Sequence, residues 1–203
     1  GCLALYAILS DKGFFPKSEL DHFCQFGALL GGHPEDNIPG VEFSTGSEGH
    51  GLSVALGMAL NGLHEKSNHR VFVILGDGET NEGSVWEAAL SIGKHKPRNL
   101  TVIIDYNKMQ SYSTTYEVED LEPIADKWKA FGFKVYDVNG HDKAALKKIF
   151  RKTKSLQGPK LIICHTVKGK GIKFIENQAI WHHKRGVTDD DIKQLLKGLE
   201  DYP

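Results

Sequence analysis

Apolar residues follow two alternating patterns along the chain. Short continuous apolar runs, typical of strands buried in a sheet, alternate with segments in which apolar residues recur every three or four positions, as on one face of a helix. The predicted strands cover residues 71–75, 100–104, 133–138 and 161–164. The predicted helices cover residues 1–9, 49–63, 85–92, 121–131, 142–153 and 188–199. This alternation predicts an α/β fold with an open, mostly parallel sheet and helices on both faces.

Three residues are predicted to cap helices, because their short side chains can accept a hydrogen bond from a free backbone N–H. They are Ser18, Asp142 and Thr188. Between the first two long helical segments, residues 31–47 are rich in Gly, Pro, Ser and Asn and predict a long loop. Loops of this length in compact domains usually carry function.

The bulk composition is that of an ordinary globular protein. The chain has 203 residues, of which 40% are apolar and 25% charged, and its formal net charge is −1. This length predicts a single domain over residues 1–203, and the charge balance gives no reason to expect nucleic acid or a membrane as a partner. The first predicted helix has no cap residue before it, so we expect the N-terminal part of the domain to be missing from this sequence.

The cysteines and the lack of targeting signals indicate a cytoplasmic protein. Cys2, Cys24 and Cys164 are odd in number and no pair has metal-ligand spacing, so we expect reduced, buried thiols. No apolar run is long enough to cross a bilayer, and no signal peptide is visible.

Polar side chains follow two of the predicted strands. Asp77 lies between Gly76 and Gly78 after the first strand, and Asn107 follows the second. Ligands of such sheets bind at the carboxyl ends of the strands, and glycines let the backbone approach a phosphate. A carboxylate, an amide oxygen, a backbone carbonyl and phosphate oxygens suit Mg²⁺. Gly-Asp-Gly alone is a common turn, and only its combination with the second strand end is specific.

Six motifs in order resemble the N-terminal, diphosphate-binding domain of transketolases, most closely the bacterial type that is split over two subunits. Asp77 and Asn107 stand about thirty residues apart, as in the diphosphate motif of thiamine-dependent enzymes. The motifs are His33-Pro34-Glu35, residues 39–53 (PGVEFSTGSEGHGLS), residues 76–83 (GDGETNEG), residues 105–110 (DYNKMQ), Lys168-Gly169-Lys170-Gly171 and Trp181-His182. The resemblance covers nearly the whole chain and implies thiamine diphosphate and Mg²⁺, or Ca²⁺ or Mn²⁺ in its place, as cofactors.

The resemblance implies a role for each residue at the metal and the diphosphate. Asp77 and Asn107 would bind the metal through their side chains and Met109 through its carbonyl. Gly78 and Asn107 would contact the diphosphate. Lys168 would approach the diphosphate, where a cation suits the negative charge.

The resemblance also implies roles at the cofactor rings and the substrate. Gly46, Ser47 and Glu48 would lie along the aminopyrimidine and thiazolium rings. His33 would face the reacting sugar, and His182 would approach both diphosphate and substrate, as suits a side chain that moves protons near neutral pH. Glu82 would sit near the dimer interface and couple to a catalytic glutamate of the partner.

The presence of each of these residues can also be explained without a functional role. His33 could be an ordinary loop histidine, and His182 with its neighbour His183 a solvated surface pair. Lys168 could belong to a solvated hairpin, and Glu82 could simply favour a helix N-terminus. The shared order of the motifs favours the functional roles.

Glu48 departs from the resemblance, because the family usually has leucine there. Our hypothesis is that its carboxylate either disfavours anionic, phosphorylated substrates, since like charges repel strongly in a low-dielectric cleft, or binds a cationic group. The alternative is that the side chain turns to solvent or to a partner subunit.

The resemblance predicts a transferase that moves a two-carbon ketol unit from a ketose to an aldose. It also predicts that the substrates are sugars, generally in phosphorylated form. The sequence given has no segment that could form the pyrimidine-binding domain of such enzymes. We therefore expect activity only with a partner subunit that carries this domain, and we expect the two chains to form a heterotetramer. One alternative is the α-subunit of a 2-oxo acid dehydrogenase or a decarboxylating ligase, which share the metal motif. Another is a non-catalytic protein on the same fold, since fold alone does not fix function.

Overall fold

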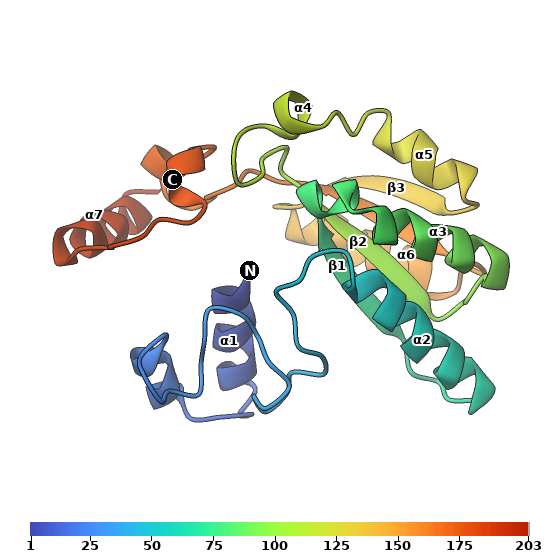
Figure 1. The fold of residues 1–203 in the computed structure, drawn as a ribbon, viewed down its shortest axis with the longest axis horizontal. Coiled ribbons are helices and arrows are strands. Elements are labelled where there is room, and N and C mark those ends of the chain that lie inside the picture. The colour runs from blue at the N-terminus through green and yellow to red at the C-terminus, as the bar shows by residue number, and fades with distance from the viewer. Residues whose placement is uncertain (203) are drawn as a thin grey trace. The chain divides into compact units, whose positions relative to one another are not determined.

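The computed structural model describes residues 1–202. Their contacts divide the chain into an N-terminal unit, residues 1–48, and a C-terminal unit that begins at Gly49 (Figure 1). The sheet lies entirely in the C-terminal unit. The single domain expected over residues 1–203 stays a prediction.

The N-terminal unit consists of helix α1 (Cys2–Asp11), a short 3-10 helix (Lys17–His22) and a long loop. The predicted cap at Ser18 is wrong, because the 3-10 helix begins one residue earlier, after Pro16, and has no side-chain cap. The unit has its own small core, which fixes the start of the loop, and the Tyr6 hydroxyl donates a hydrogen bond of 2.9 Å to the Gly31 carbonyl. The buried apolar residues are Tyr6, Leu9, Phe15, Leu30 and Ile38.

Four parallel strands form the sheet of the C-terminal unit, in the order β1-β2-β4-β3. They are β1 (Val71–Gly76), β2 (Leu100–Tyr106), β3 (Lys134–Asn139) and β4 (Lys160–His165). The predicted strands and their parallel arrangement are confirmed. In the register of β1 and β2, Gly76 is the partner of Asp105, so the two motif-bearing strand ends are direct neighbours.

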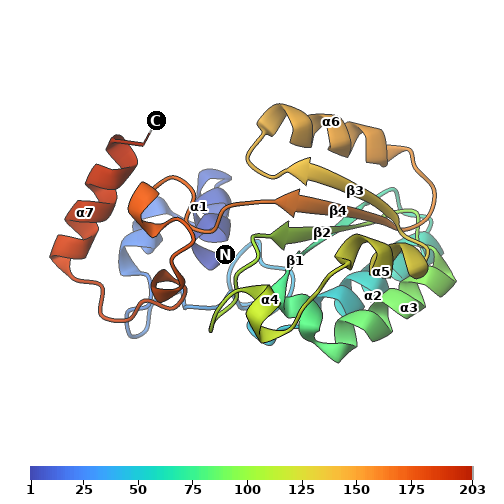
Figure 2. The same ribbon diagram turned by 90° about the horizontal axis from the view of Figure 1, so that it is seen from above.

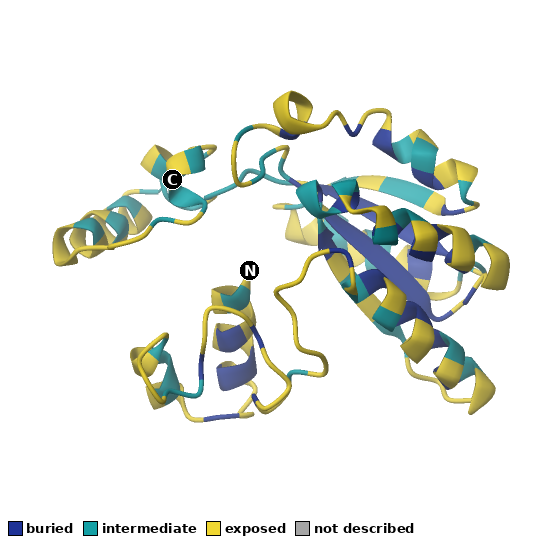
Figure 3. Ribbon diagram, in the orientation of Figure 1, coloured by how far each residue is buried: buried dark blue, intermediate teal, exposed yellow. Residues whose placement is uncertain are grey.

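Helices cover both faces of the sheet, as predicted (Figure 2). One face packs against α2 (Gly51–His64), α3 (Gly83–His95) and α5 (Ile124–Ala130). The other packs against α6 (Lys143–Lys154). The apolar run of β1 predicts a strand buried in the sheet, but β1 is an edge strand, and its Phe72 and Ile74 are 45% and 69% exposed. Central strand β2 is buried along nearly its whole length (Figure 3).

The predicted helix caps in this unit are confirmed. The Asp142 side chain accepts hydrogen bonds of 2.8 and 3.0 Å from the N–H groups of Ala144 and Ala145. Thr188 caps α7 (Asp189–Glu200) and forms a reciprocal capping box with Asp191.

Two local elements differ from the predictions. Helix α5 begins at Ile124 rather than at residue 121, because Pro123 is extended and disfavours helical conformation in the residue before it. A short helix, α4 (Thr115–Val118), was not predicted. It is capped by the Thr114 side chain, which accepts a hydrogen bond from the N–H of Glu117.

All three cysteines are free thiols, as expected, but they are not all buried. Cys164 is buried, Cys2 is half-buried and Cys24 is exposed, so the expectation of burial is wrong for Cys24. Among residues 1–202, no helix combines the length and the apolar character that crossing a membrane requires.

We expect Asp142→Ala to lower the free energy of unfolding by about 1 kcal/mol, because two N–H groups at the start of α6 lose their acceptor. Asp142→Asn, which keeps a capping oxygen, should unfold like the wild type. Urea denaturation of the two variants measures the difference, and equal stability of both would contradict this role of Asp142.

Candidate functional site

The Asp77 carboxylate joins the ends of β1 and β2. Its side chain is 1% exposed. One carboxylate oxygen accepts a hydrogen bond of 2.8 Å from the N–H of Gly78, and the other accepts one from the N–H of Lys108, in the loop after β2. The Asp77 N–H in turn donates to the carbonyl of Asp105 at 3.2 Å. The structure therefore brings together the two strand ends that the sequence singled out.

Burial dominates the electrostatics of Asp77. It raises the pKa of the carboxyl above its usual value, because a charge is poorly solvated inside the protein. The N–H donors of Lys108 and Gly78 act in the opposite direction and lower the pKa, but they do not cancel the effect of burial. The charge of Asp105 raises the pKa further, while that of Lys168 lowers it. A cation beside Asp77 would supply the remaining compensation.

The loop after β2 offers further oxygen atoms. The Asn107 amide oxygen accepts a hydrogen bond of 3.0 Å from the N–H of Met109. Lys108 takes a left-handed conformation, with φ of 63°, and its N–H donates to Asp77. Within residues 1–202 no three His, Cys, Asp or Glu side chains could hold a metal among themselves. The Asp77 carboxylate and the Asn107 amide oxygen are oxygen donors of the kind that Mg²⁺ and Ca²⁺ bind.

Gly78 and Gln110 are pressed together beside Asp77. A Cβ atom at position 78 would lie 2.7 Å from Oε1 and 2.9 Å from Cβ of Gln110, so only glycine fits. The Gln110 amide nitrogen is buried and has no hydrogen-bond partner among the described residues. In the sequence Gln110 is part of a motif, but no role was predicted for it.

His182 is a partly buried, neutral imidazole. Burial, followed by the charges of Lys168 and His183, lowers its pKa to about 4. Its Nδ1 atom is buried and has no partner among the described residues, while its Nε2 lies 3.4 Å from the hydroxyl of Ser111. The His183 ring meets the His182 ring at a centroid distance of 4.4 Å and lies 3.4 Å from the same hydroxyl. The pair is therefore linked to the loop after β2 rather than freely solvated.

Glu82 is exposed at the position before α3 and makes no capping hydrogen bond with its side chain. Its Cβ and Cγ lie against the backbone of Gly49. The predicted coupling of Glu82 to a partner subunit stays a prediction.

In the N-terminal unit, His33 and Gly46 are brought together. The missing Cβ of Gly46 would lie 3.1 Å from the His33 ring, and Gly46 has φ of 133°. The loop closes on itself through the N–H of Thr45, which donates to the Pro34 carbonyl at 2.9 Å. Ser47 and Glu48 are exposed. The predicted roles of His33 and of residues 46–48 stay predictions.

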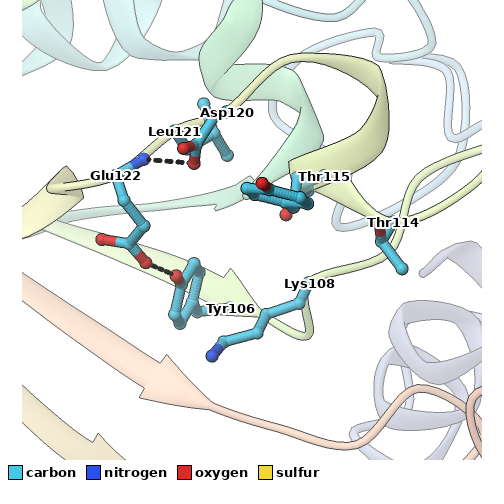
Figure 4. Close-up of a pocket in the computed structure, with 8 residues that line it drawn as sticks. Tyr106, Lys108, Thr114, Thr115, Asp120, Leu121 and Glu122 are labelled. Atoms are coloured by element: carbon cyan, nitrogen blue, oxygen red, sulfur yellow. Dashed lines mark hydrogen bonds between the residues drawn. The ribbon is translucent and has the colours of Figure 1, made fainter.

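A cavity of about 320 Å³ lies beside the loop after β2 (Figure 4). The Tyr106 hydroxyl donates to the Glu122 carboxylate in its wall, and the N–H of Glu122 donates to Asp120 at 3.0 Å. Lys108 also lines the cavity, but Asp77 and Asn107 do not. The cavity therefore adjoins the cluster around Asp77 at Lys108 but does not include the two proposed metal ligands.

Comparison with known proteins gives consistent matches. The family model "Transketolase, thiamine diphosphate binding domain" matches residues 1–200. The chain is 43% identical to one subunit of the apulose-4-phosphate transketolase of Phocaeicola vulgatus, over 89% of this chain and 64% of that protein. It is 38% identical to 6-deoxy-6-sulfo-D-fructose transketolase subunit SqwG of Clostridium sp. over 97% of this chain and 72% of that protein. The chain thus spans less than two thirds of the length of the first of these relatives.

Solved structures match over the same range. The transketolase from Leishmania mexicana superimposes with a TM-score of 0.89 and 29% identity, covering 98% of this chain and 32% of that one. The transketolase from Campylobacter jejuni matches with a TM-score of 0.83 and 28% identity, over 90% of this chain and 30% of that one.

We expect Gly78→Ala to lower the free energy of unfolding by about 1–3 kcal/mol, the usual cost of forcing an extra atom into a packed site. Gly83→Ala is the matched control, because a Cβ at position 83, at the start of α3, would meet nothing within 4 Å. Thermal unfolding of both variants checks this, and a stable Gly78→Ala protein would show that Gln110 can move aside.

We expect His182 to make the protein less stable in mild acid. Its pKa is about 4 in the folded protein against a usual 6.5, so the unfolded chain binds the proton more readily between these values. The contribution of neutral His182 is complete above pH 6.5 and is lost as the pH falls toward 4. The unfolding free energy of His182→Gln should therefore decline less over this range, and an NMR titration of the His182 ring gives its pKa directly. Identical pH profiles of both proteins would contradict the assignment.

Proposed function

The chain belongs to the transketolase family, whose thiamine diphosphate-binding domain it matches, and from this membership we propose that it forms the diphosphate-binding part of a ketol-transferring enzyme. The proposed reaction moves a two-carbon unit from a ketose donor to an aldose acceptor. The buried Asp77 carboxylate, held between two strand ends, is the observation that carries the proposal. The transketolase names of the relatives favour this function over a 2-oxo acid dehydrogenase or a decarboxylating ligase.

The proposed cofactors are thiamine diphosphate and Mg²⁺. Asp77 and Asn107 would hold the metal with their side-chain oxygens and Met109 with its carbonyl, and the raised pKa of the buried Asp77 carboxyl supports a cation there. Gly78, at the strand end beside Asp77, would contact the diphosphate through its backbone. The positive charge of Lys168 lowers the pKa of Asp77, and the same charge would interact with the diphosphate.

When bound, thiamine diphosphate supplies a nucleophilic carbon that can break and form the bond next to a ketose carbonyl. This chain would supply proton transfers at the sugar oxygens. The pKa of His182, about 4, keeps its imidazole neutral near pH 7, so that one ring nitrogen would donate and the other accept a hydrogen bond at these oxygens. We propose His33 as the second such group and residues 46–48 as contacts of the cofactor rings.

We further propose that the enzyme is completed by a second chain. Two relatives are named as single subunits of a transketolase, which supports a partner that carries the pyrimidine-binding domain. A heterotetramer and the coupling of Glu82 to a glutamate of the partner belong to the same proposal.

Phosphorylated sugars are the proposed substrates, since these two relatives are named for a sugar phosphate. The free thiols support a reducing compartment, the cytoplasm.

Calorimetric titration with thiamine diphosphate tests the proposal, with and without Mg²⁺ and a partner subunit. We expect binding that requires the metal. Asp77→Ala should weaken it by more than about 100-fold, since even outer-shell partners of a bound metal are worth about 10–100-fold. Asp126→Ala, which removes an exposed carboxylate on α5, should bind like the wild type. No binding by the wild-type complex in the presence of Mg²⁺ would favour a non-catalytic protein instead.

A further inference from the structure

The Glu79 carboxylate connects two segments that are distant in sequence. One of its oxygens accepts a hydrogen bond of 2.9 Å from the N–H of Gly49, just before α2. The other accepts a hydrogen bond of 3.1 Å from the N–H of Gly76, the last residue of β1. A single side chain thus bridges the start of a helix and the end of the strand that leads into Asp77.

Gly49 is held from a second direction as well. The Ser84 hydroxyl donates a hydrogen bond of 3.0 Å to the Gly49 carbonyl. Gly49 has φ of +84°, and a Cβ there would lie 2.5 Å from the Ser84 hydroxyl oxygen and 2.8 Å from Cβ of Glu82. Residues 79–84 therefore clamp both backbone polar groups of a glycine that could not be replaced without displacing them.

A simpler role for Glu79 would be to favour the N-terminus of the short 3-10 helix Gly78–Asn81 in which it lies. Its hydrogen bonds do not fit that role alone. Both acceptor contacts go to N–H groups outside this helix, at Gly49 and Gly76. A hydrogen bond to a charged acceptor is about twice as strong as a neutral one, so the bridge fixes the separation of the two segments firmly.

We propose that Glu79 is a positioning residue for cofactor binding, which holds the β1 end that carries Asp77 at a fixed separation from the backbone at Gly49. The inference rests on the proposed function. Asp77 is the proposed metal ligand, and Gly49 directly follows residues 46–48, the proposed ring contacts, in the sequence. Neither the sequence motifs nor the roles implied by the family resemblance assign Glu79 a task.

The test compares three variants of the full chain in complex with its partner subunit. Glu79→Gln keeps the size of the side chain but loses one acceptor, and Glu79→Asp keeps the charge but is one methylene too short to span both N–H groups. Glu65→Gln, an exposed residue after α2, is the matched control. The measurements are the apparent Kd of thiamine diphosphate with Mg²⁺, the split between KM for the cofactor and kcat, thermal unfolding, and amide exchange at Gly49 and Gly76.

We expect both Glu79 variants to bind the cofactor about tenfold more weakly, the effect of losing one hydrogen bond to a charged group. The KM for the cofactor should rise while kcat at saturation changes little, and amide exchange at Gly49 and Gly76 should become faster. Glu65→Gln should match the wild type in every measurement.

Three results would overturn the inference. One is a lowered thermal midpoint with unchanged cofactor affinity, which would mean that Glu79 only stabilises the fold. Another is wild-type affinity in Glu79→Asp, which would mean that the charge rather than the bridge acts. The third is wild-type affinity in Glu79→Gln. If the wild-type complex itself binds no cofactor, the proposed function fails, a result distinct from all three.

Discussion

An almost completely buried carboxylate is the feature on which the rest of the candidate site depends. Asp77 is costly to bury as a charge, and its pKa is raised accordingly. Its two oxygens recover part of that cost from the N–H groups of Gly78 and Lys108. Because those donors come from two different strand ends, satisfying one side chain also fixes how the two loops lie against each other. What the donors leave uncompensated is the physical reason to expect a cation.

Several unusual backbone features surround this carboxylate. Lys108 takes a left-handed conformation, and its N–H reaches Asp77. Gly78 has no room for a side chain, because Gln110 fills the space where its Cβ would be. The parallel register of the sheet contributes as well. It pairs Gly76 with Asp105 and so places the loops after β1 and β2 side by side, at the carboxyl ends of the two strands. The local backbone conformation and the sheet topology thus both contribute to the surroundings of the Asp77 carboxylate.

The sequence predicted those parts of the structure that depend on local pattern. Continuous apolar runs marked the four strands, and Asp142 and Thr188 were found as caps because a cap needs only a short polar side chain next to a helix. The predicted cap at Ser18 is wrong, since the 3-10 helix begins at Lys17 and Pro16, two residues before Ser18, is the residue that precedes it. Strand order, and with it the exposure of Phe72 and Ile74 at the sheet edge, depends on pairing between distant segments that periodicity does not encode.

The same limit separates the residues that motifs identified from those that only the structure revealed. Asp77, Asn107 and His182 lie in sequence motifs, and a motif can be recognised from the order of residues without a structure. Glu79 stands inside one of those motifs and still gave no signal, because its partner Gly49 lies thirty residues away. The electrostatic character of His182 also depends on the fold: burial, together with the charge of Lys168 fourteen residues before it, lowers its pKa to about 4. Sequence therefore identifies which groups are available for chemistry, while the fold determines their protonation and the distances between them.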